Sequence, residues 1–192
     1  PEGPHMLDME YVRNNIGDIK LKDLQMPIGI DYDTVEYVTL DLSKALTIGV
    51  TGREGYGKTN FTKLLISQLQ SKIFDAASKV YIIDDYEKQL EPLSSFGVVE
   101  RNSIDLGDFE NILTDVEEEL QTRLRLVQAE GIGVLSEMPL IFIVVQNNDI
   151  YTPDGISKTA VEAYKRILKT YRNMKVCFLF SNIANVGIAY GA

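Results

Sequence analysis

The chain has 192 residues, and 45% of them are hydrophobic, which is enough to fill one sizeable core. Aspartate and glutamate number 28 against 19 lysines and arginines, so the net charge is −9. Because affinity for nucleic-acid phosphates comes from basic residues, this acidic balance argues against a domain whose main work is binding DNA or RNA.

The chain contains one cysteine, Cys177, and one histidine, His5. A single cysteine excludes an internal disulfide and a cysteine-built zinc site, and its apolar neighbours predict a buried core thiol rather than a reactive one. His5 lies in residues 1–6, a run typical of a cleaved tag remnant. Histidine-based acid–base or metal chemistry is therefore not expected. No apolar run is long enough to span a bilayer, so we expect a soluble piece, even if a parent protein is anchored.

Taken in order, the chain begins with a polar N-terminal extension at 7–25, followed by a turn-rich stretch at 26–31. The run 35–42 alternates and is rich in β-branched residues, which predicts a strand leading into a short apolar strand at 45–51. Nothing repeats and no low-complexity linker divides the chain, so we place a single domain at 26–192.

Residues 52–59 read GREGYGKT and match the phosphate-loop pattern GxxxxGK[ST]. Because a triphosphate must be wrapped by backbone N–H groups, the loop needs glycines that let the backbone approach the anion. Lys58 can then reach the β- and γ-phosphates, and the Thr59 hydroxyl can bind Mg²⁺. The predicted nucleotide-binding residues are Gly52, Arg53, Glu54, Gly55, Tyr56, Gly57, Lys58, Thr59 and Asn60.

So short a motif also occurs by chance in glycine-rich turns. The elements on either side of it decide whether it is a true phosphate loop. An apolar strand at 45–51 precedes it, and Phe61, Leu64, Leu65 and Leu69 follow at helical spacing. The start of that helix points its positive N-terminal end at the same anion. Strand, loop and helix occur in the order that nucleotide binding requires. At the loop tip, base stacking and simple exposure both remain open for the tyrosine.

The apolar run 80–83 predicts a buried strand that ends in Asp84 and Asp85. Polar residues at the carboxyl end of a parallel strand face the ligand crevice, so these carboxylates are candidates to approach Mg²⁺ or substrate. A solvated strand end is the alternative.

The longest predicted helix spans 109–130, with an apolar stripe on one face and Gly131 as its stop. Two of its residues, Arg123 and Arg125, could act as trans-acting arginines in an oligomer. The alternative is that they pair with the carboxylates at 117–119 of the same helix.

The apolar strand at 140–145 ends in Gln146 and Asn147. Phosphate-loop hydrolases end this strand with Asp, which holds the Mg²⁺ shell, and many follow it with Glu, which activates water. Neutral amides cannot act as a general base and are weaker partners for Mg²⁺. Asp149 comes two or three residues late and would need a bulge to stand in. The pattern predicts that nucleotide is held but turned over slowly or not at all.

A helix at 157–171 and a strand at 176–180 complete the predicted elements, and the strand ends in Ser181 and Asn182. If the strand lies beside the phosphate loop, Asn182 is positioned like a polar γ-phosphate sensor. A plain strand cap is the alternative.

Together these features resemble the FtsK/SpoIIIE-type ATPase domains, and most closely the C-terminal ATPase domains of the EssC-type coupling ATPases of type VII secretion, over about residues 26–190. The features that carry the resemblance are 28–31, 40–42, 52–59, 83–85, 116–123 and 140–145. The resemblance implies an α/β fold of the P-loop NTPase class (RecA-like, ASCE), with a mainly parallel β-sheet sandwiched by helices, and ATP and Mg²⁺ as ligands.

The resemblance further implies a cytoplasmic domain of a cell-membrane protein, with sister ATPase domains in the same chain. It also implies a homo-hexamer in the full-length protein and export of small helical proteins of the WXG100 type. Such domains have a larger sheet than this chain predicts, so we expect a domain cut short on its C-terminal side. The acidic balance fits a protein exporter better than a DNA pump.

The chain departs from active members of this group at Gln146 and Asn147, where they carry acidic residues, and at Ser181 and Asn182, where Thr-Arg or Thr-Gln is usual. We therefore expect an ATP-binding domain with weak or no hydrolysis and a regulatory or substrate-receiving role in protein export. The alternatives are an interaction module with a relic nucleotide site and an active phosphate-loop kinase.

Overall fold

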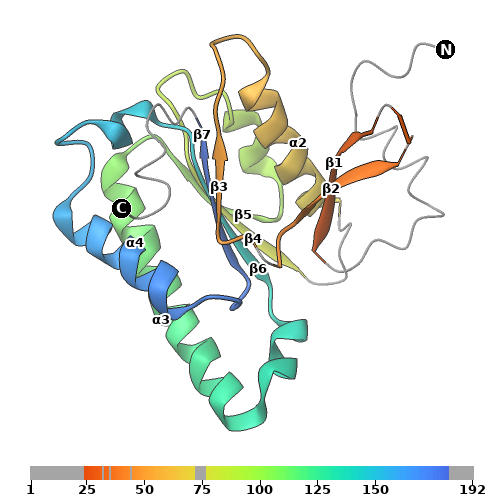
Figure 1. Ribbon diagram of the computed structural model, residues 1–192. Coiled ribbons are helices and arrows are strands. Elements are labelled where there is room, and N and C mark those ends of the chain that lie inside the picture. Colours follow the sequence, from red (N-terminus) through yellow and green to blue (C-terminus); the bar gives the residue numbers. More distant parts are fainter. Residues whose placement is uncertain (1–23, 32, 35, 44, 72–76, 182–192) are drawn as a thin grey trace.

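The computed structural model describes residues 24–31, 33–34, 36–43, 45–71 and 77–181. Its centre is a five-stranded parallel sheet with helices on both faces (Figure 1). The strands are β3 (Thr47–Val50), β4 (Ser78–Ile83), β5 (Val99–Ser103), β6 (Leu140–Val145) and β7 (Val176–Ser181). Their order across the sheet is β3-β7-β6-β4-β5. The predicted fold, a parallel sheet between helices, is confirmed.

The helices divide between the two faces of the sheet. Helix α2 (Lys58–Gln70) covers one face together with the short 3₁₀ helix η1 (Glu91–Ser95), and α3 (Leu106–Glu130) and α4 (Lys158–Thr170) cover the other (Figure 1). Two more 3₁₀ helices, η2 (Ile132–Glu137) and η3 (Asn148–Tyr151), flank β6 in the chain. Within the described ranges, no helix combines the length and apolarity that crossing a bilayer needs.

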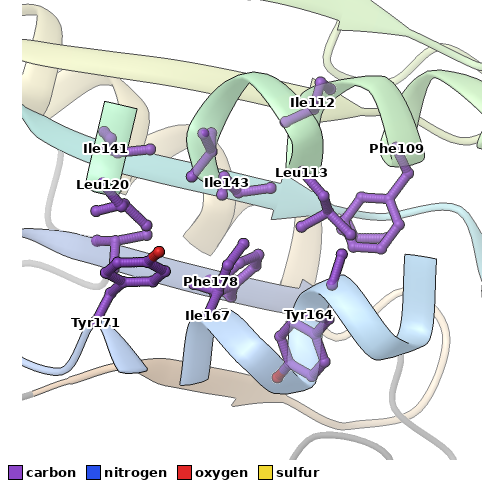
Figure 2. Packing of buried hydrophobic residues seen from close by; sticks show 14 of the residues in the cluster. Phe109, Ile112, Leu113, Leu120, Ile141, Ile143, Tyr164, Ile167, Tyr171 and Phe178 are labelled. Atoms are coloured by element: carbon purple, nitrogen blue, oxygen red, sulfur yellow. The ribbon is translucent and has the colours of Figure 1, made fainter. Parts of the chain in front are cut away.

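The two central strands, β6 and β7, are buried along their whole length. Alternate side chains of each strand enter opposite cores, because successive residues of a strand point to opposite faces. Figure 2 shows one of these cores, in which the side chains of α3 and α4 pack against Ile141, Ile143 and Phe178. Cys177 lies in the other core, fully buried, and this burial raises the pKa of its thiol. The predicted core thiol is confirmed.

A separate antiparallel hairpin lies beside α2, formed by β1 (Gln25–Ile30) and β2 (Tyr37–Asp41). The side-chain amide of Gln68 on α2 donates to the carbonyl of Pro27 at 2.8 Å, which ties the hairpin to the domain. The prediction of a turn-rich stretch at 26–31 is therefore wrong, because most of these residues form the strand β1. The strand predicted at 35–42 exists, but it lies in this hairpin rather than in the main sheet. The expected tag remnant and residues 7–23 lie outside the described residues.

Arg123 on α3 is only 2% exposed, so it cannot reach into a neighbouring subunit. Its guanidinium donates to the carbonyl of Met174 at 3.0 Å and pairs with Glu119 one turn earlier. Glu119 also accepts from Lys79 of β4 at 2.8 Å. A trans-acting role for Arg123 is therefore wrong, and pairing with a helix carboxylate is confirmed. Arg125 is exposed, and its role stays untested.

This network predicts acid sensitivity. Burial alone raises the pKa of Glu119, but hydrogen bonds from Lys79 and Arg123 outweigh it and hold the pKa below its ordinary value of 4.5. A carboxyl with a depressed folded pKa stabilises the protein above its unfolded pKa, and the stabilisation is lost as pH falls through the folded pKa. In urea unfolding, the stability gap between wild type and Glu119→Gln should therefore shrink as pH falls from 7 to about 3.

The matched control is Glu118→Gln, on the exposed face of the same helix turn. It should change the unfolding free energy by no more than about 0.5 kcal/mol at pH 7. A gap for Glu119→Gln that stays constant down to the acid limit would show that the ionised carboxylate contributes nothing.

Candidate functional site

The loop between β3 and α2 has backbone angles that only glycine adopts readily. Gly52, Gly55 and Gly57 have φ values of 151°, 78° and 84°. Gly57 is the N-cap of α2 and is left-handed, and the helix begins at Lys58. The loop therefore presents the positive N-terminal end of a helix to solvent, which is a site suited to an anion.

The Lys58 side chain folds back over this loop. Its ammonium donates to the carbonyls of Gly52 and Arg53, both at 2.8 Å. These bonds hold the positive charge inside the loop. A phosphate entering there meets both the ammonium and the free N–H groups of the helix start.

A pocket of about 880 Å³ opens over the loop and the carboxyl ends of β4 and β6. Seven of the predicted site residues line it, whereas Arg53 and Tyr56 are not among its lining residues, and Tyr56 is 76% exposed. β7 does lie beside β3, but Asn182 itself is outside the described residues. The lining residues are Gly52, Glu54, Gly55, Gly57, Lys58, Thr59, Asn60, Asp85, Tyr86, Glu87, Gln89, Asn147, Asn148 and Asp149.

Thr59 is the centre of a hydrogen-bond network that joins three strand ends. Its hydroxyl donates to Gln89 Oε1 at 2.7 Å. Gln146 Nε2 lies 3.3 Å from Thr59 Oγ1 and 3.2 Å from Asp85 Oδ2, so it donates to both. Gln89 Nε2 in turn donates to Glu87 at 2.7 Å. The hydroxyl predicted to bind Mg²⁺ is thus held in place by two amides.

The two aspartates at the end of β4 have different roles. Asp84 is 1% exposed, and its two carboxylate oxygens accept from the backbone N–H groups of Asp85 and Leu90 at 2.9 and 2.8 Å. Burial raises the pKa of Asp84, and these hydrogen bonds partly oppose the rise. The alternative that Asp84 is a solvated strand end is therefore wrong. Its carboxylate instead holds the backbone of the segment between β4 and η1. Asp85 instead lines the pocket.

The two amide side chains that follow β6 also have different roles. Gln146 faces Thr59, whereas Asn147 caps η3 by accepting from the backbone of Asp149 at 2.9 Å. The neighbouring Asp149 carboxylate raises the pKa of the Tyr86 hydroxyl. Asp149 lies in η3, beyond the end of β6, and no hydrogen bond joins it to Thr59 or Gln146 among the described residues.

The pocket is also lined by Gln89, Tyr86 and Glu87, which are not among the residues predicted from the sequence. All three belong to the polar segment that follows Asp84 and Asp85. The signal that could have found them is their place just after the carboxyl end of a parallel strand.

The donors in this pocket fit a magnesium ion only in the company of phosphate. Among the described residues there is no group of three or more Asp, Glu, His and Cys side chains that could hold a metal alone. Mg²⁺ in nucleotide sites needs only one or two protein oxygens, because phosphates and waters complete its shell. Thr59 supplies a hydroxyl, and Asp85, Glu87 and Asp149 are carboxylates among the lining residues. The donor set is suited to a metal–nucleotide complex.

Fold and loop together define the P-loop NTPase class. No protein-family model matches the sequence, and no curated protein matches it. Among solved structures, the cytoplasmic domain of EssC is similar with a TM-score of 0.74 and 18% identity, covering 95% of this chain and 35% of that one. EccC from Thermomonospora curvata (ATPases 2 and 3, with a signal sequence peptide) has a TM-score of 0.64 and 18% identity, covering 83% and 29%. The pCW3 conjugation coupling protein TcpA, with ATPγS, has a TM-score of 0.66 and 16% identity, covering 95% and 52%.

These similarities establish the fold. The likeness to FtsK/SpoIIIE-type and EssC-type ATPase domains, which the sequence predicts, is confirmed as a likeness of structure. The chain spans only about a third of the EssC and EccC chains that it matches, since it covers 35% and 29% of their lengths.

The segment that carries Asp149 is closed by a tight turn at Gly155, and this predicts a sensitive position. A Cβ added at Gly155 would lie 1.6 Å from the carbonyl oxygen of Asp149, so the backbone must move. Gly155→Ala should cost about 1–3 kcal/mol of unfolding free energy, measured by urea denaturation. Gly133→Ala is the control, because nothing lies within 4 Å of its added Cβ. Equal stability of the two variants would contradict the described turn.

Proposed function

We propose that this chain is an ATP-binding domain of a type VII secretion coupling motor, and that it hydrolyses ATP weakly or not at all. The observation that carries the proposal is the pairing of an intact phosphate loop with an amide, Gln146, at the end of β6. The loop has the charge and backbone geometry for a triphosphate. The strand end lacks the acidic residues that activate water.

The division of labour among the residues follows from their chemistry. The loop N–H groups and Lys58 hold the phosphates, and Thr59 holds Mg²⁺, which neutralises phosphate charge when it is bound. Gln146 orients Thr59 but cannot accept a proton from water, because its amide is not basic. Binding energy is therefore available, whereas the end of β6 supplies no base for the proton transfer that hydrolysis needs.

The wider assembly is part of the same proposal. The EccC structure is described as ATPases 2 and 3, and it holds a signal sequence peptide, which supports sister ATPase domains and a substrate-receiving or regulatory role here. The TcpA structure holds ATPγS, which supports ATP as the nucleotide. By the same likeness, we propose a cytoplasmic domain of a cell-membrane parent, assembly as a homo-hexamer, and WXG100-type proteins as the exported class.

Calorimetric titration of ATP with Mg²⁺ tests the nucleotide proposal. We expect micromolar binding, and a rise in melting temperature with Mg-ATP, because a ligand selective for the folded state stabilises it. Lys58→Ala should lose both, since its ammonium is the cation inside the loop. Lys169→Ala, at an exposed lysine in the last turn of α4 that does not line the pocket, should behave as wild type.

Steady-state phosphate release on the same samples tests the second half of the proposal. We expect turnover close to background in wild type. Turnover comparable to that of an active motor, abolished by Lys58→Ala, would refute impaired hydrolysis. No heat from either protein would favour an interaction module with a relic site, and phosphoryl transfer to a small acceptor would favour a kinase.

A further inference from the structure

The carboxyl ends of β4 and β6 lie side by side in the sheet. Ile83 pairs with Val145, and the backbone N–H of Gln146 donates to the carbonyl of Ile83 at 2.8 Å. The residues that follow each strand therefore meet at one edge. β6 contributes an amide at this edge, and β4 contributes the carboxylate of Asp85.

One amide nitrogen joins this carboxylate to the phosphate loop. Gln146 Nε2 is 3.2 Å from Asp85 Oδ2 and 3.3 Å from Thr59 Oγ1. The orientation of the amide is fixed, because the carboxylate accepts only and the Thr59 hydroxyl already donates its hydrogen to Gln89. Thr59 Oγ1 thus accepts one hydrogen bond and keeps a second lone pair for a cation.

The other end of the same amide is unsatisfied. Gln146 is 1% exposed, and its Oε1 has no hydrogen-bond partner among the described residues. A buried acceptor without a partner costs free energy, and such atoms are usually met by an ordered water. Gln146 does not line the pocket, so this acceptor adds no metal ligand, and the metal-binding groups at this edge are the Thr59 hydroxyl and the Asp85 carboxylate.

From this arrangement we propose that Asp85 supplies the carboxylate of the Mg²⁺–nucleotide site, in place of the acidic residue missing from β6. Gln146 is a positioning residue that holds Asp85 and Thr59 together. The inference rests on the proposed nucleotide binding and adds to it the source of the metal-binding charge. The cation it requires is a hydrated divalent ion carried by a nucleoside triphosphate.

The other nearby carboxylates fit this role less well. Asp84 is buried, and both its oxygens are used by backbone N–H groups. Asp149 lies beyond the end of β6, in η3, and within the described ranges no hydrogen bond joins it to Thr59 or Gln146. Glu87 is exposed, and it is linked to Thr59 through the whole Gln89 amide, whose nitrogen bonds Glu87 and whose oxygen bonds Thr59. Asp85 is linked to Thr59 more directly, because the same nitrogen of Gln146 bonds both residues.

The test measures how strongly Mg²⁺ tightens binding of a non-hydrolysable ATP analogue, by calorimetry with Mg²⁺ and with EDTA. In wild type, Mg²⁺ should tighten binding. Asp85→Asn should reduce this tightening roughly 10–100-fold, the usual cost of losing a metal-orienting partner. Binding in EDTA should not weaken, because the variant removes a negative charge next to the polyphosphate.

A charge swap separates a metal role from a structural one. Gln146→Glu combined with Asp85→Asn moves the carboxylate from β4 to β6 and should restore most of the Mg²⁺ effect, which a folding defect could not do. Glu91→Gln removes an exposed charge outside the pocket and should leave the Mg²⁺ effect unchanged. Melting curves check that each variant is folded.

The outcomes are distinct. If wild type binds the analogue but Asp85→Asn keeps the full Mg²⁺ effect, or if Glu87→Gln loses it instead, the assignment of Asp85 is wrong and nucleotide binding stands. The assignment is also wrong if wild type binds equally with Mg²⁺ and EDTA, or if the charge swap restores nothing. If wild type does not bind the analogue at all, the proposed function fails and the inference fails with it.

Discussion

Complete burial of β6 and β7 is the constraint on which the rest of this structure depends. Every residue of both strands is buried, so the sheet must be covered on two faces, as is usual for parallel sheets. α2 covers one face, and α3 with α4 covers the other. With both faces closed by apolar side chains, polar chemistry can gather only at the strand ends. The carboxyl ends of β3, β4 and β6 therefore form the site.

The neutral amide at the end of β6 and the carboxylate at the end of β4 are physically linked. Asp84 is already buried at this edge, and its raised pKa records the cost of desolvating a carboxylate there. An acidic side chain in place of Gln146 would face Asp85 across about 3.2 Å, and like charges at that distance repel. Gln146 instead donates to Asp85, so one carboxylate is kept and held by a neutral partner.

Much of the fold could be predicted from the sequence because its signals are local. The strand predicted at 140–145 has those bounds in the structure, and the helix predicted at 109–130 begins only three residues earlier, at Leu106. Periodicity and caps decide such elements: Asp105 accepts from the backbone of Gly107 at the start of that helix, and Gly131 ends it. At the start of α2 the local signal is Gly57, a glycine placed just before the apolar residues at helical spacing.

Two strands had no such signal. β1 contains Pro27 and Gly29, which favour turns, and the register shifts between them; pairing with β2 and the burial of Met26 override that local preference. β5 has the sequence VERNS, with no apolar alternation, and it pairs only with β4 among the described strands. An edge strand needs little burial, so its pattern is weak.

The same distinction applies to the site, where some features depend on neighbouring residues in the chain and others depend on the order of the strands. The phosphate loop is a contiguous segment, and its glycine angles and its lysine follow from residues that are neighbours in the chain. The relation between Asp85 and Gln146, 61 residues apart, depends on β4 lying beside β6, and no periodicity encodes strand order. Sequence reasoning could therefore identify both strand ends as polar but not join them. In the sequence, Gln146 marks only a missing acidic residue, whereas the sheet places the Asp85 carboxylate one hydrogen bond away from it.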